Sequence, residues 1–311
     1  MEMTLLFVFL FQDKLFAVVL GGLSITTVIN VAICIYVFSR SFCVKKEYIK
    51  YSLRLALPLV PHVVSASLLT SATKIIITKL CGSADTAYYS VVSTCAMVVT
   101  LFITSINAAW APWFYNRMAN DDYTSIRKVA KVTIPLLALV ALGVCLVGPE
   151  VILILGGRSY MEAVYMLPPM IFACVLRYVY TLYVNIEFYN KKTGGISVAT
   201  AITAIFNVVL NYSLIRIFDY KAAAYAAMIS DILLLAIHMY IVKRQGRWDV
   251  FNNKSNILIL LAAGIICMSV LFLYSSVILR YAVIAVILIA MAAMVWKYRN
   301  VILSLLKSKE R

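Results

Sequence analysis

Apolar residues along the chain occur in blocks of about twenty, the length at which a helix crosses a bilayer, with short polar segments between them. This pattern predicts an all-α integral membrane protein, a polytopic bundle of about nine transmembrane helices. The predicted spans are Leu15–Phe38, Ser52–Leu80, Thr86–Trp113, Ile126–Val147, Glu162–Phe188, Gly194–Ile217, Ala222–Val242, Asn256–Ile278 and Tyr281–Trp296. The second is long for one crossing, and Pro58 and Pro61 predict a kink in it.

Composition supports the membrane class and excludes several others. Hydrophobic residues make up 64% of the chain and charged residues 13%, whereas soluble domains are nearer half apolar and a quarter charged. The seven cysteines show no CxxC spacing and there are only two histidines, so we predict buried thiols and no metal site. We also predict no cofactor, no catalytic residues and no enzymatic activity, because the chain lacks a phosphate-binding loop or hydrolase motif and any large loop.

Basic residues are distributed unevenly among the loops. The net charge is +15, and most of the lysines and arginines fall in one set of alternate loops and in the C-terminal tail. The positive-inside rule places that set in the cytoplasm, so we predict a multi-pass protein with a cytoplasmic C-terminus. The charge then matches an anionic lipid leaflet and predicts no nucleic-acid partner.

The N-terminal segment fits this topology poorly. Nine spans and an inside C-terminus place the residues before Leu15 outside, yet Met1–Phe11 is apolar and too short to cross. It also lacks the basic leader and cleavage site of a signal peptide. We expect an N-terminally shortened version of a longer protein, and the alternative is a peripheral or re-entrant segment.

Polar residues inside the spans are the candidate functional groups, because ionisable side chains in a bilayer tend to face protein or water. A stripe at helical spacing on the second span consists of Ser67, Thr70, Ser71, Lys74 and Thr78. One interpretation is that this stripe lines a hydrated path for an anionic solute. Alternatively, Lys74 extends to the outer interface and the hydroxyls bond neighbouring helices.

Arg177 lies in the middle of its span, and Glu187 follows on roughly the same face near the cytoplasmic end. Arginine stays charged and binds phosphate in a bidentate manner. Arg177 is therefore predicted either to bind a substrate phosphate or to pair with a carboxylate elsewhere.

Asp231, Glu187 and His62 are candidates for ion coupling or for structural roles. Asp231 and His238 are seven apart and share a helix face, which permits coupled protonation or, alternatively, a buried polar contact for Asp231 and an interfacial position for His238. His62 follows the proline pair, where freed carbonyls need donors. A second polar stripe, predicted to join helices, consists of Thr200, Thr203, Asn207 and Asn211.

Four segments carry a resemblance to a known family. They read YSLRLALPLVPH from Tyr51, INAAWAPWFY over Ile106–Tyr115, RSYMEAVYMLPP over Arg158–Pro169 and VNIEFYNKKT over Val184–Thr193. The chain resembles the C-terminal two-thirds of a Wzx-type oligosaccharide flippase, of the polysaccharide-biosynthesis branch of the MOP superfamily. The residues that carry the motifs are Pro58, Pro61, Asn107, Trp110, Pro112, Trp113, Tyr160 and Asn185.

The resemblance implies two six-helix lobes around a central cavity, with two extra C-terminal helices in some members. Residues 1–51 would then be the end of the N-terminal lobe, residues 52–243 the six-helix MOP/MATE-like C-terminal lobe, and residues 244–311 two additional helices and a basic tail. Most of the N-terminal lobe would be absent from this chain.

The resemblance also implies a function and its partners. Family members move a polyprenyl-diphosphate-linked oligosaccharide across the bacterial inner membrane for O-antigen (lipopolysaccharide), capsule or exopolysaccharide, beside a polysaccharide polymerase and chain-length proteins. Their basic cavity makes Lys74 and Arg177 the leading candidates here, with Ser67, Ser71 and Thr78 beside Lys74. The chain departs from the family where Thr73-Lys74 replaces a frequent Asp-Arg pair, which puts ion coupling there in doubt.

Alternatives of other classes remain open at this level. Another MOP transporter, such as a lipid II flippase or a cation-coupled antiporter, would share the fold, but an antiporter is expected to show acidic residues in its cavity. A membrane polymerase or glycosyltransferase would need a large loop that the chain lacks. A truncated, inactive fragment is the last alternative, because one lobe cannot enclose a two-lobed cavity without a partner or a second copy.

Overall fold

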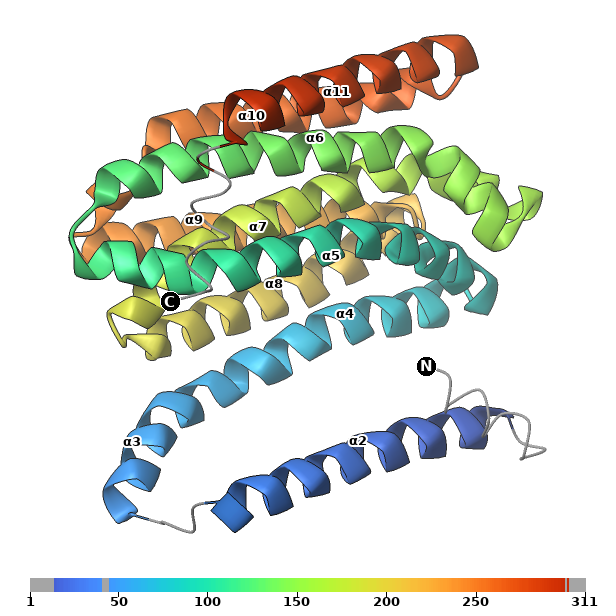
Figure 1. Cartoon of the computed structure of the whole chain (residues 1–311). Helices are drawn as coiled ribbons and strands as arrows, with labels where there is room; N and C mark the ends of the chain where they lie inside the picture. Colours follow the sequence, from blue (N-terminus) through green and yellow to red (C-terminus); the bar gives the residue numbers. More distant parts are fainter. Residues whose placement is uncertain (1–13, 41–44, 300, 302–311) are drawn as a thin grey trace. The chain divides into compact units, whose positions relative to one another are not determined.

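All secondary structure in the described part of the chain is helical, which confirms the predicted all-α class (Figure 1). The computed structural model describes residues 14–40, 45–299 and 301. Seven stretches are long and apolar enough to cross a membrane. These are α5 (Ser83–Ala119), α6 (Tyr123–Gly156), η2 with α7 (Arg158–Met166 and Leu167–Tyr189), α8 (Thr193–Phe218), α9 (Ala222–Arg244), α10 (Asn253–Leu273) and α11 (Val277–Lys297). The other two predicted spans correspond to helices α2 (Lys14–Arg40) and α4 (Val60–Leu80).

The predicted span Ser52–Leu80 is not one helix. Its first residues belong to α3 (Lys46–Ala56), and a 3-10 turn, η1 (Leu57–Leu59), separates α3 from α4. Pro58 lies in that turn and, like every proline, has no backbone N–H to continue a helix. The kink is therefore confirmed as a complete break, whereas the predicted start of the span is wrong.

A second predicted boundary is also wrong. The fifth span was expected to begin at Glu162, but residues Arg158–Met166 form the 3-10 helix η2 and α7 begins at Leu167. Pro168 and Pro169 lie in the first turn of α7, where a helix tolerates proline because those N–H groups have no intrahelical acceptor.

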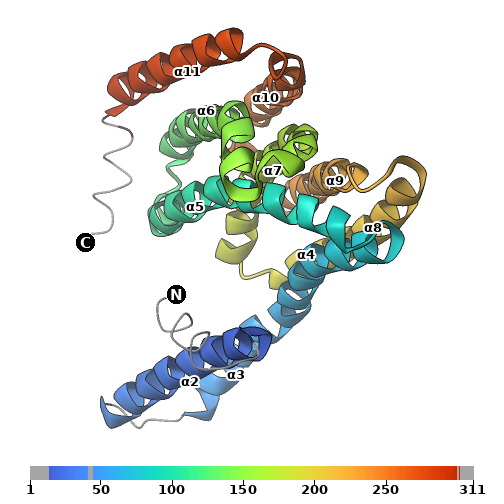
Figure 2. The ribbon, with the colours of Figure 1, turned by 90° about the vertical axis from the view of Figure 1, so that its right-hand side faces the viewer.

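The contacts divide the chain into two units, Met1–Arg54 and Leu55–Arg311. The first unit contains α2 and most of α3. In the second unit, α7 is the central helix and packs against α5, α6, α8, α9 and α10. Helices α10 and α11 pack on the outside of this bundle against α6, as Figure 2 shows.

An aromatic cluster forms the core at one end of the bundle. Trp110 and Trp113 of α5 are almost fully buried, with ring centroids 5.4 Å apart. The Trp110 ring also stacks on Phe114 at 5.6 Å and on Phe251, before α10, at 6.4 Å. Large buried aromatic rings contribute much of a core's packing energy, so packing explains the motif around Trp110.

Other residues of the resemblance motifs join helices. The Tyr115 hydroxyl donates to Asn185 Oδ1 at 3.1 Å, and the Thr181 hydroxyl donates to Asn107 Oδ1 at 3.3 Å. Both hydrogen bonds connect α5 to α7. The ring of Tyr160 in η2 lies 4.9 Å from that of Tyr88 in α5. These side chains therefore hold the lobe together.

Two helix boundaries depend on specific local chemistry. Gly157 ends α6 with a φ of 80°, a region that glycine enters without a steric penalty. At the other end of α6, the Asp122 carboxylate accepts from the Ser125 backbone N–H at 3.1 Å, the usual N-cap arrangement. Hydrogen bonds from Ser125 and the nearby Arg117 cation hold the pKa of Asp122 below its ordinary value.

The thiols of Cys145 in α6 and Cys267 in α10 are buried, with their sulfur atoms 3.5 Å apart. We expect copper–phenanthroline oxidation of isolated membranes to join them as a disulfide, because only a small movement brings the sulfurs to bonding distance. After cleavage in the loop around Lys191, the two fragments should remain together until a reductant is added. A Cys145→Ser variant is the control, and fragments that separate without reduction would contradict this packing of α10 on α6.

Candidate functional site

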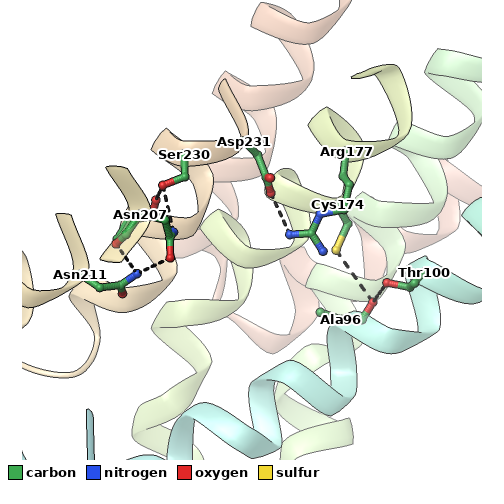
Figure 3. A network of polar contacts seen from close by, with 9 residues as sticks. Ala96, Thr100, Cys174, Arg177, Asn207, Asn211, Ser230 and Asp231 are labelled. Carbon is green, nitrogen blue, oxygen red and sulfur yellow. Dashed lines mark hydrogen bonds and ion pairs between the residues drawn. The ribbon is translucent and has the colours of Figure 1, made fainter. Parts of the chain in front are cut away.

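The central feature of the candidate site is an ion pair between two neighbouring helices. Arg177 lies in the middle of α7 and Asp231 in α9. Arg177 Nη2 donates to Asp231 Oδ2 at 2.9 Å. Figure 3 shows the two side chains pointing toward one another. Of the two roles predicted for Arg177, the pairing with a carboxylate is therefore confirmed.

The two partners differ in exposure. The Asp231 side chain is 7% exposed, whereas that of Arg177 is 45% exposed. A buried carboxylate is stable only beside a counter-charge, so Asp231 depends on Arg177. Most of the N–H donors of the guanidinium have no hydrogen-bond partner among the described residues. Arg177 can consequently hold Asp231 and an external anion together.

A separate chain of polar contacts, which begins at the residue next to Asp231, joins α9, α8 and α4. Ser230, beside Asp231, accepts from Asn207 Nδ2 at 2.9 Å. Asn211 Nδ2 donates to Asn207 Oδ1 at 2.9 Å and to Thr73 Oγ1 at 3.4 Å. Figure 3 shows the α8 and α9 part of this network. The prediction that this stripe joins helices is confirmed for Asn207 and Asn211, whereas the Thr203 hydroxyl donates to the Ala199 carbonyl within α8.

A second buried polar pair joins the same two helices. His238 Nδ1 in α9 and Glu187 Oε1 in α7 lie 2.5 Å apart, and both side chains are fully buried. A Cβ atom at Gly195 would lie only 3.1 Å from Glu187 Oε2, so the glycine allows α8 to approach closely. Asp231 and His238 share a face, as predicted, but each contacts a side chain of α7 rather than the other. The alternative that His238 lies at the interface is wrong, because its side chain is fully buried.

The predicted stripe on α4 is only partly described. Lys74 and Ser71 are exposed. Thr78 donates to the Lys74 carbonyl at 2.8 Å and shares a 2.7 Å hydrogen bond with Thr86 of α5. No contact within the described chain joins Lys74 to Arg177, so a shared role for these two cations stays a prediction. The side chains of His62, Ser67 and Thr70 lie outside the described part of the chain.

Sequence reasoning missed the ion pair between Arg280 and Glu150. Arg280 falls between the last two predicted spans, but it lies in the first turn of α11 and contacts the Glu150 carboxylate of α6. The Tyr281 hydroxyl donates to the same carboxylate at 3.2 Å. Glu150 lies within the last turns of a spanning helix. Because an acid at that depth needs a partner, the position of Glu150 in the sequence could have indicated this ion pair.

Comparison with known proteins places the first part of the chain near one described family. Residues 2–118 match the family described as polysaccharide biosynthesis protein. The chain is similar to polysaccharide biosynthesis proteins. That finding confirms the resemblance derived from the sequence motifs, and the matched residues include α4 and α5, which carry Lys74 and the Trp110 cluster.

The chain is also similar to a curated protein of the Lsg locus of Haemophilus influenzae. It is 23% identical over 199 residues, which cover 63% of this chain and 49% of the relative. The chain thus spans about half the length of the curated relative that it matches. No solved structure matches it significantly.

Proposed function

We propose that the chain takes part in moving a lipid-linked oligosaccharide, carried on a polyprenyl diphosphate, across the bacterial inner membrane. The observation that supports this function best is the half-exposed guanidinium of Arg177, held by a buried carboxylate within a membrane-spanning bundle. Arginine binds phosphate oxygens bidentately, and a charged group at such depth usually marks a substrate path. The similarity to polysaccharide biosynthesis proteins supports a saccharide as the cargo.

The proposed mechanism is alternating access, in which two lobes rock about a site near the midplane. The glycan and diphosphate would pass along the polar surface while the polyprenyl tail stays in lipid. Because the polar head cannot cross hydrocarbon unaided, the cation at Arg177 would compensate the diphosphate charge during passage. The chain would work with a partner lobe or a second copy, without enzymatic chemistry, and beside a polysaccharide polymerase and chain-length proteins.

Cation-coupled antiport is supported less well by the same geometry. An antiporter needs an acidic side chain that is open to its cation. Asp231 is occupied by Arg177, and Glu187 is occupied by His238 and fully buried. The exposed charge of the α7–α9 site is positive, which favours an anionic head group.

The test is an in-frame deletion of the gene followed by complementation with the full chain. We expect the deletion to abolish surface polysaccharide and to leave lipid-linked saccharide inaccessible to a membrane-impermeant oxidant in spheroplasts. Complementation should restore both properties. If the saccharide of the deletion strain reaches the outer leaflet at the wild-type rate, the proposed function is wrong.

A further inference from the structure

A hollow of about 450 Å³ lies among the ends of α6, η2, α10 and α11, away from the Arg177 site. Its charged lining residues are Glu150, Glu162 and Arg280. The rings of Tyr165 and Tyr274 also line it, with centroids 6.4 Å apart in an edge-to-face arrangement. The size and the mixed lining are typical of a small-ligand site.

The charged groups of the hollow are incompletely satisfied. Arg280 Nη2 donates to Glu150 Oε1, but the second carboxylate oxygen of Glu150 has no hydrogen-bond partner among the described residues. The Arg280 side chain is 5% exposed, and its buried Nε–H also lacks an acceptor within the described chain. The hollow thus offers a carboxylate oxygen of Glu150 that its own residues leave free, beside a guanidinium with one unpaired N–H, and buried groups of this kind normally have partners.

The surroundings place the hollow at the boundary between hydrocarbon and water. Tyr274 and Tyr281 lie where α10 ends and α11 begins, and tyrosine is enriched at membrane interfaces. Leu153 and Val277 line the hollow and are exposed apolar residues, and Ile278 beside them is 86% exposed. A molecule in the hollow would therefore have its polar part among the charges and its apolar part in the bilayer.

We propose that this hollow binds the head group of a phospholipid with a primary ammonium, that is, a phosphatidylethanolamine. The ammonium donates to the free carboxylate oxygens of Glu150 and Glu162, and the phosphate pairs with the guanidinium of Arg280. A choline head group has no N–H donors, and a glycerol head group has hydroxyl donors but no positive charge for the two carboxylates. The lipid would join α6 to α11 at their shared end, a role independent of the proposed transport.

The test is native mass spectrometry of the full chain with equimolar phosphatidylethanolamine, phosphatidylcholine and phosphatidylglycerol of identical acyl chains. We expect phosphatidylethanolamine to bind preferentially. Glu150→Gln should lower that preference about tenfold, as expected for the loss of a charge-assisted hydrogen bond. Glu162→Gln should lower it as well, and because the Glu162 side chain is 73% exposed this change should leave the fold intact.

An Asp85→Asn variant is the matched control, because Asp85 is an acid in the first turn of α5 that does not line the hollow. It should keep the wild-type preference. Equal binding of the three lipids, a preference for phosphatidylcholine or phosphatidylglycerol, or an unchanged preference in Glu162→Gln would each overturn the proposal. If Glu150→Gln does not fold, the Glu162→Gln result decides alone.

Discussion

Arg177→Glu should lower surface polysaccharide by at least about tenfold, in cells that contain the variant chain at wild-type levels. The substitution removes the half-exposed cation from α7 and places a second carboxylate beside Asp231. Loss of one charge-assisted contact corresponds to about a tenfold to hundredfold change in binding, and like charges add repulsion. The measurement is quantitative surface glycan staining, with the chain level checked by immunoblot of membranes.

A charge exchange separates binding from stability at this site. The double variant Arg177→Asp, Asp231→Arg restores an ion pair between α7 and α9, so it should restore much of the thermal stability. It should not restore polysaccharide display, because position 231 is buried and would withdraw the cation from the open surface. Full recovery of display in the double variant would show that Arg177 is only structural.

Removing one partner of the Glu187–His238 pair should destabilise the chain strongly. His238→Leu leaves the fully buried Glu187 carboxylate without its 2.5 Å contact. Breaking a buried pair in this way typically costs about 3–5 kcal/mol, so the unfolding midpoint in detergent should fall by on the order of 10 °C. Glu187→Leu combined with His238→Leu should recover most of the loss, because apolar residues need no counter-charge.

The exposed pair between Lys221 and Glu162 is the matched control for this experiment. Its atoms are 3.4 Å apart and the Glu162 side chain is 73% exposed. Exposed pairs contribute about 0–1 kcal/mol, so Lys221→Met should shift the midpoint little. If the unfolding midpoint falls no further after His238→Leu than after Lys221→Met, the buried Glu187–His238 pair is not essential for stability.

The sequence predicts helix faces better than it predicts partners. Spacing placed Asp231 and His238 on one face of α9, and the structure agrees. It could not show that their ionic contacts are Arg177 and Glu187, more than fifty positions away along the chain, because periodicity describes one helix at a time. The choice of partner depends on which helices pack together, and that information lies in the tertiary contacts.

Span boundaries show a similar limit. Hydropathy identified every described helix from α5 to α11, but it extended one span across the break at η1 and began another inside η2. Apolar residues continue through both breaks, whereas backbone geometry changes at Pro58 and at Gly157. Proline was interpreted as a kink, and only the structure shows that the chain forms a 3-10 turn there.

The role proposed for the α7–α9 site depends most directly on whether Arg177 contacts a diphosphate. Binding of a polyprenyl diphosphate and of the uncharged polyprenol of equal chain length should be compared by native mass spectrometry, for the wild-type chain and for Arg177→Gln. If Arg177 presents its cation to the substrate, the wild-type chain should prefer the diphosphate. In Arg177→Gln that preference should be about tenfold lower. An equal preference for the diphosphate in both chains would contradict the role assigned to Arg177.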